Sequence, residues 1–165
     1  MSLRYPNHFT REEEMKVIKY LFCACFIFFS INPHAEENWH IDVHTFSYHF
    51  SKRKNNMDWN QVNLGLGLRR EFSDSISVQA GFFRNSIDRW SLYAITDWTP
   101  ISMGNWKAGA YAGIRTNYEK PVMLAGGALL RWQGERYSTT LRLMPKTCNT
   151  CSGLISIEFG WKFNM

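Results

Sequence analysis

The feature that most constrains this chain is a series of about eight segments in which every second side chain is large and apolar. A period of two places alternate side chains on opposite faces of a β-strand, whereas a helix repeats every 3.6 residues. Turn-forming residues separate the segments, which predicts an all-β chain. The segments begin near Trp39, Trp59, Ser75, Asp88, Gly104, Pro121, Glu135 and Gly153.

The positions of the aromatic residues distinguish a membrane barrel from a soluble sandwich. If the strands run up and down with both termini at one end, the rings gather at that end on the apolar face, as in the aromatic girdle of outer-membrane barrels. We therefore predict an eight-stranded antiparallel up-and-down transmembrane β-barrel after a cleaved signal peptide, with small and polar residues facing inward. The expected girdle comprises Trp39, Phe72, Trp98, Trp106, Trp132, Tyr137, Trp161 and Phe163.

The N-terminal segment has the pattern of a signal peptide. Lys16 and Lys19 precede an apolar run over residues 20–31, which is shorter than the roughly 20 residues that a transmembrane helix needs. We expect cleavage near Ala35, with Met15 as an alternative start, and an N-terminal anchor helix is the competing interpretation.

Residues 1–35 are therefore expected to be an N-terminal extension plus signal peptide, and residues 36–165 the barrel domain in the outer membrane of a Gram-negative bacterium. The two cysteines of the barrel domain, Cys148 and Cys151, are predicted to form a local disulfide in an oxidising compartment. A redox or metal role for this CxxC is the alternative, but no second ligand pair accompanies it.

The chain carries a net charge of +5, which raises the question of nucleic-acid binding. Its lysines and arginines are dispersed, and no basic helix or phosphate-binding loop is present, so we expect no nucleic-acid partner. No metal ligand set or cofactor motif is found, and no cofactor is expected.

The inward positions divide by height into a polar floor near the termini and an apolar upper part. Either the apolar residues plug the lumen, or they form a pocket for one acyl chain. Strict alternation would point Thr45, Ser47 and His49 toward lipid, so we expect a β-bulge near Phe46. The floor includes His40, Asp42, Arg69, Ser77, Gln79, Arg131, Ser138, Arg142 and Glu158, and the upper part includes Phe83, Tyr93, Ile95, Tyr111, Met123 and Met144.

Several short motifs resemble the lipid A palmitoyltransferase (PagP-type) family over nearly the whole barrel domain. These are HTFSYHF, FFRNSIDRW, KPVMLAGGALLRW and RLMPKT. The resemblance implies an outer-membrane acyltransferase that moves a palmitoyl chain from a phospholipid to lipid A. Its partners would be membrane lipids, including lipopolysaccharide, and the outer-membrane assembly machinery during biogenesis. A closed barrel needs no partner to pair its strand edges, so we expect a monomer.

The family's functional residues are a histidine near the top of the first strand and an Asp-Ser pair in the second outer loop. The pair matches Asn85 and Ser86, so the serine is retained and the carboxylate is not; Asp88 is a candidate substitute. The histidine is His44 or His49. A histidine base would activate Ser86 or an acceptor hydroxyl, and Asn85 or Arg89 would stabilise the oxyanion.

Substrate contacts are expected along the apolar part of the interior and in the second outer loop. Loss of the aspartate favours an alternative, a non-enzymatic or inactive surface barrel. A lipid A deacylase fits less well, because no His-x-Ser motif lies on a strand as expected. The expected substrate-binding residues are Phe83, Tyr93, Ile95, Tyr111, Met123 and Arg89.

Overall fold

The computed structural model describes residues 38–52, 58–118, 120–146 and 152–164. Within these ranges the chain forms eight strands, and none of its segments is a helix that could cross a bilayer. The expected signal peptide, Cys148 and Cys151 lie outside the described residues, so those predictions stay untested. The strands are β1 (Asn38–His49), β2 (Val62–Glu71), β3 (Ile76–Arg84), β4 (Trp90–Met103), β5 (Trp106–Thr116), β6 (Val122–Gln133), β7 (Tyr137–Met144) and β8 (Leu154–Asn164).

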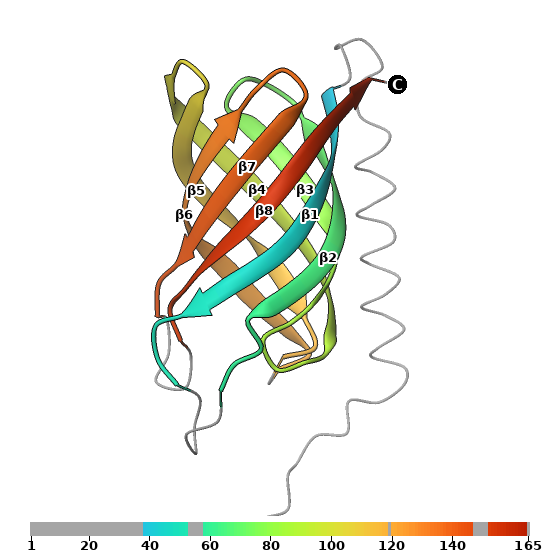
Figure 1. The fold of residues 1–165 in the computed structure, drawn as a ribbon, viewed down its shortest axis with the longest axis vertical. Helices are drawn as coiled ribbons and strands as arrows, with labels where there is room; N and C mark the ends of the chain where they lie inside the picture. The colour runs from blue at the N-terminus through green and yellow to red at the C-terminus, as the bar shows by residue number, and fades with distance from the viewer. Residues whose placement is uncertain (1–37, 53–57, 119, 147–151, 165) are drawn as a thin grey trace, which may run out of the picture. The chain divides into compact units, whose positions relative to one another are not determined.

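The strands form one closed antiparallel barrel in chain order, as Figure 1 shows. The barrel closes between β1 and β8, where Trp39 lies opposite Phe163 and His49 opposite Leu154. Closure pairs the backbone groups that an open sheet would leave at its edges. The predicted fold class is confirmed, and each strand begins within three residues of its predicted start.

The outer surface is apolar because the large side chains of each strand point away from the axis. On β2, for example, Leu64, Leu66 and Leu68 are exposed, while the intervening positions are buried. Trp98, Trp106, Tyr137 and Trp161 are also exposed, each toward the end of the barrel where β1 begins and β8 ends.

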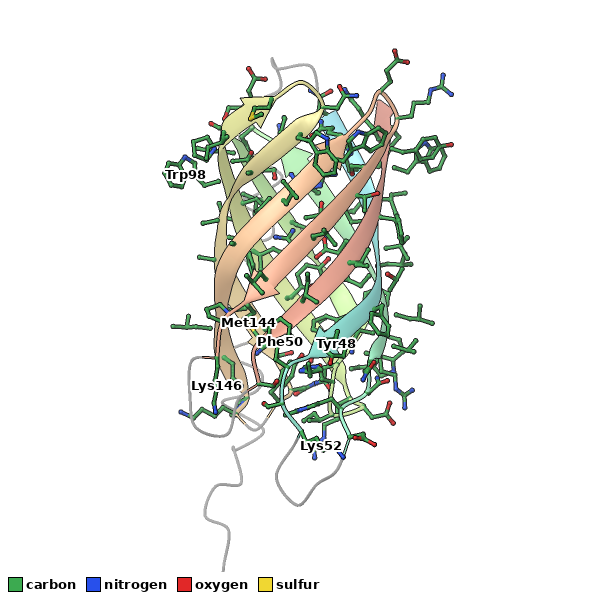
Figure 2. All side chains as sticks on the ribbon, turned by 60° about the vertical axis from the view of Figure 1, so that its left-hand side comes forward. Tyr48, Phe50, Lys52, Trp98, Met144 and Lys146 are labelled. Carbon is green, nitrogen blue, oxygen red and sulfur yellow. The ribbon has the colours of Figure 1, made fainter. Side chains whose placement is uncertain are left out.

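The two ends of the barrel are distinguished by the connections that lie there. The connections β1–β2, β3–β4, β5–β6 and β7–β8 lie at one end, which we call the loop end, and Asn38 and Asn164, the first and last residues of the barrel strands, lie at the other, the terminal end. Figure 2 shows Lys52 and Lys146 at the loop end and Trp98 near the terminal end.

A β-bulge at Thr45 reverses the inward and outward phase of β1. The register of β1 with both neighbours shifts between His44 and Phe46. Before the bulge Asp42 is buried inside, and after it Ser47 is buried while Phe46 and Tyr48 are exposed. The bulge expected near Phe46 is confirmed, and it turns Ser47 and His49 into the barrel.

The interior near the terminal end is filled by ion pairs. Arg142 pairs with Asp97 and Glu158, both at 2.6 Å, and Arg131 pairs with Asp97 at 2.5 Å. Arg69 pairs with Asp42 at 2.9 Å. All these side chains are buried. Each charge has a partner of opposite sign, whose attraction offsets the free-energy cost of removing the charge from water. The predicted polar floor is thus confirmed.

Candidate functional site

A histidine and a serine meet inside the barrel near the loop end. The His49 Nε2 atom lies 2.8 Å from the Ser86 Oγ atom. His49 is the last residue of β1, and Ser86 follows β3, so strands that do not pair with one another bring the two side chains together. Ser86 is buried, and it is the bulge at Thr45 that aims His49 inward. The geometry suits proton transfer from Ser86 to the imidazole in the tautomer whose Nε2 is free to accept.

Trp59 and Asn60 fix the two sides of this pair. The His49 ring stacks on the Trp59 ring with centroids 4.8 Å apart and an interplanar angle of 21°. The Asn60 backbone N–H donates to the Ser86 carbonyl at 2.9 Å, and the Asn60 side chain donates to the Asn85 carbonyl at 3.2 Å. One short segment before β2 therefore holds both the histidine and the turn that carries the serine.

A chain of polar contacts runs from His49 through Ser47 to Asn63. The Ser47 Oγ lies 3.4 Å from His49 Nε2 and donates its own proton to the Asn63 side-chain oxygen. The Asn63 amide donates in turn to the Arg84 carbonyl at 2.9 Å. The His49 Nδ1 atom is buried without a hydrogen-bond partner among the described residues. The imidazole is thus oriented by stacking and by hydroxyl groups.

Tyr118 and Arg115 complete the surroundings of Ser86. The Arg115 guanidinium carbon lies 4.2 Å from the centroid of the Tyr118 ring. Tyr118 belongs to the turn after β5, and its burial raises the pKa of its hydroxyl above the usual value. Tyr118 and Ser86 line the same cavity, and the protonated hydroxyl of a tyrosine is a hydrogen-bond donor.

Asn85, a predicted catalytic residue, uses its whole side chain to build the β3–β4 turn. Its oxygen accepts from the backbone N–H groups of Ile87 and Arg89 at 3.0 and 2.9 Å. Its amide donates to the Ser91 hydroxyl at 2.8 Å and to the Asn117 carbonyl at 2.9 Å. An amide has two donors and one oxygen with two lone pairs, so no capacity is left for a substrate. The structure places Asn85 beneath Ser86 as a positioning residue.

Asp88 and Arg89 lie at the exposed tip of the same turn. Asp88 has a positive φ of 67° and pairs with Arg84 at 2.6 Å. The hydrogen bond from Arg84 lowers the pKa of the Asp88 carboxyl. Arg89 is exposed and lines neither of the cavities described below. Neither side chain contacts the His49–Ser86 pair.

His44, the other predicted histidine, lies deeper in the barrel. Its Nδ1 atom is 3.5 Å from Glu158 Oε1, and its ring contacts those of Phe83 and Tyr93 at centroid distances of 5.5 and 4.7 Å. It lines the same cavity as Ser86, but the structure gives the serine contact to His49.

Two adjoining cavities lie beside Ser86, with volumes of about 90 and 50 Å³. The predicted substrate-binding residues Phe83, Tyr93, Ile95 and Tyr111 line the first, and Met123 lines the second. Both are well below the roughly 300–1,000 Å³ of typical ligand pockets.

Large side chains occupy the room that the wall glycines leave. The Tyr93 hydroxyl fills the space beside Gly67, and Ile95 fills the space beside Gly113. Large side chains thus take up part of the interior, and Ser86 lines both of the cavities described above.

Several residues of this site were not predicted from the sequence: Ser47, Trp59, Asn63, Arg115, Tyr118 and, in the floor, Asp97. Alternation alone places Asp97 inside, because Trp98 points outward. The others depend on the bulge or on turns, whose side-chain directions no simple period gives. In the described part of the chain, no group of three or more His, Cys, Asp or Glu side chains could hold a metal ion.

Comparison with known proteins identifies the fold and nothing finer. No protein-family model matches the chain, and no curated protein sequence matches it either. A de novo designed protein, TMB2.3, solved by solution NMR, superimposes with a TM-score of 0.60 at 12% identity, over 81% of this chain and 100% of that one.

A second structure, titled "De novo design of transmembrane beta-barrels", gives a TM-score of 0.59 at 12% identity, over 79% of this chain and 98% of its own length. The fold is that of a transmembrane β-barrel. The resemblance to the palmitoyltransferase family receives no support from these matches.

Proposed function

We propose that the protein is an outer-membrane acyltransferase in which Ser86 attacks a lipid ester and His49 is the base. The observation that carries this proposal is the 2.8 Å contact between His49 Nε2 and Ser86 Oγ. A nucleophile within hydrogen-bond reach of a base is the arrangement that acyl transfer requires. The apolar outer surface would keep the barrel in a bilayer, next to ester-bearing lipids.

The proposed reaction consists of two acyl transfers, the first to Ser86 and the second to lipid A. Ser86 gives its proton to His49 and bonds to the ester carbonyl carbon; the bond from that carbon to the lipid oxygen breaks, and His49 returns the proton to the departing alcohol. A lipid A hydroxyl then loses its proton to His49 and takes the acyl group from Ser86, which regains a proton. Tyr118 would donate a hydrogen bond to the oxyanion in each step.

The small cavities define which part of the lipid enters the barrel. They accommodate the reacting ester and a short adjoining stretch of chain, so most of the acyl chain would lie against the apolar outer wall. This differs from the interior acyl pocket that the family resemblance implies.

The test is a mass spectrum of lipid A from a Gram-negative host that lacks its own palmitoyltransferase and expresses this protein. We expect a gain of one acyl chain, lost in Ser86→Ala and reduced at least about 100-fold in His49→Gln. Ser102→Ala, at an exposed serine of the terminal end, should keep the activity, and His44→Gln should reduce it less than His49→Gln does. An unchanged spectrum with a folded barrel would reject the proposal, and a loss of mass would indicate a deacylase.

A second candidate, a barrel that binds lipid without reacting with it, is favoured by one observation. The buried Nδ1 atom of His49 has no carboxylate partner among the described residues. In serine-histidine enzymes, a third group usually orients this atom and stabilises the imidazolium. This candidate predicts folded protein, bound lipid and unmodified lipid A.

A further inference from the structure

Arg115 differs from the other arginines that face the barrel interior. Arg69, Arg131 and Arg142 each pair with a buried carboxylate. Arg115, near the end of β5, forms no ion pair with any described residue. Its Nε–H is buried and has no hydrogen-bond acceptor in the described part of the chain. A partly buried cation without a counterion is costly unless an anion joins it.

The location of Arg115 connects it to the reacting group. Arg115 lines both cavities together with Ser86 and Tyr118. The ring of Tyr118 packs against the guanidinium, and the buried Nε–H has no acceptor among the described residues. A planar guanidinium with free donors suits two oxygens of one anionic group.

The rim of the loop end also favours an anion, because more cations than carboxylates are exposed there. Lys52, Arg89, Lys120 and Lys146 are exposed there together with one carboxylate, Asp58, and none of these five forms an ion pair among the described residues. Asp88, in contrast, is already paired with Arg84. Such a rim attracts anions toward the barrel entrance. In a lipid, the anionic group closest to the acyl esters is the phosphate.

We propose that Arg115 binds the phosphate of the glycerophospholipid whose acyl ester reaches Ser86. This inference rests on the proposed function for the placement of the ester, and what it adds is the residue that holds the phosphate of the donor lipid. The guanidinium holds the headgroup beside Tyr118, while the ester carbonyl lies at Ser86. A neutral diacylglycerol has the same esters and lacks the group that Arg115 binds.

Binding in the absence of turnover tests this inference. The full barrel carrying Ser86→Ala would be titrated in neutral detergent with an ether-linked phosphatidylglycerol, and separately with the matching dialkylglycerol, which has no phosphate. Adding Arg115→Met should weaken binding of the phospholipid about tenfold or more, the loss expected for a charge-assisted hydrogen bond. Binding of the dialkylglycerol should not change, and Arg136→Met, at an exposed turn of the terminal end, should leave both affinities within about twofold.

Two outcomes would overturn the inference. In one, Arg115→Met leaves phospholipid binding intact or weakens both ligands equally, while unboiled and boiled samples still migrate differently and so report a folded barrel. In the other, only a phosphorylated lipid A disaccharide loses affinity, which would assign Arg115 to the acceptor. Because Ser86 is absent from every sample, phosphate-dependent binding can be found even if the proposed acyl transfer fails.

Discussion

At the scale of single residues, Asn85 explains why an amide stands where the resembling family has a carboxylate. Its two donated and two accepted hydrogen bonds tie the β3–β4 turn to Ser91 and Asn117. A carboxylate could accept the two backbone N–H groups but could not donate to a hydroxyl and a carbonyl. The absence of aspartate is therefore accounted for by the turn and says little about whether the protein is active.

Asn85→Asp is accordingly expected to damage the protein rather than to improve it. The change removes both donors and sets a negative charge against the Asn117 carbonyl, at a cost of about 1–3 kcal/mol in unfolding free energy. Urea denaturation of the barrel in detergent, followed by tryptophan fluorescence, measures this cost. Asn105→Asp, at an exposed turn of the terminal end, is the matched control. Equal stability of the two variants would contradict the role assigned to Asn85.

At the scale of the element, the bulge in β1 changes which of its residues face inward, and this change brings Ser47 and His49 into the site. One extra residue, Thr45, is accommodated because its hydroxyl donates to the Ile157 carbonyl at 3.0 Å. The half of β1 before it contributes Asp42 to the ionic floor, and the half after it contributes Ser47 and His49 to the hydroxyl cluster. Without the extra residue, only one of these halves could face inward.

Cysteine labelling can test this change of phase. In a chain whose native cysteines are replaced by serine, Tyr48→Cys should react rapidly with a maleimide added to the folded barrel in detergent. Ser47→Cys should react at least about tenfold more slowly, because alternate residues of a strand face opposite sides of the sheet. The same two variants unfolded in urea should react equally. Rapid labelling at 47 and protection at 48 would mean that the bulge is absent.

At the scale of the whole molecule, Asp97 joins strands that are far apart around the barrel. This carboxylate on β4 accepts hydrogen bonds from Arg131 on β6 and from Arg142 on β7. Arg142 also donates a hydrogen bond to Glu158 on β8. Gln79 on β3 accepts from Arg142 as well. The network therefore spans the lumen and supports the cavity floor beneath His44 and Ser86.

Asp97→Asn is expected to destabilise the barrel by about 3–5 kcal/mol, because it leaves two buried guanidinium groups sharing fewer negative charges. The temperature at which the unboiled gel band converts to the unfolded band should fall, and the urea midpoint should fall with it. Asp74→Asn, at an exposed turn of the terminal end, should change neither. A variant as stable as the original would show that the network contributes no net stability.

The sequence by itself determined the number of strands, their approximate limits, the closed barrel and the polar floor. These follow from a period of two, since each residue's face depends only on its neighbours along the strand. It also indicated the bulge, because the polar residues of β1 change phase near Phe46.

Only the tertiary structure decided which histidine meets Ser86, what Asn85 does, and which side chains fill the space beside the wall glycines. Those outcomes depend on contacts between strands that are not adjacent and on turn conformations. Alternation specifies the face that a side chain occupies, but the side chains around it in three dimensions determine its partner. Ser86 thus has His49 beside it, and the space next to Gly67 holds the Tyr93 hydroxyl.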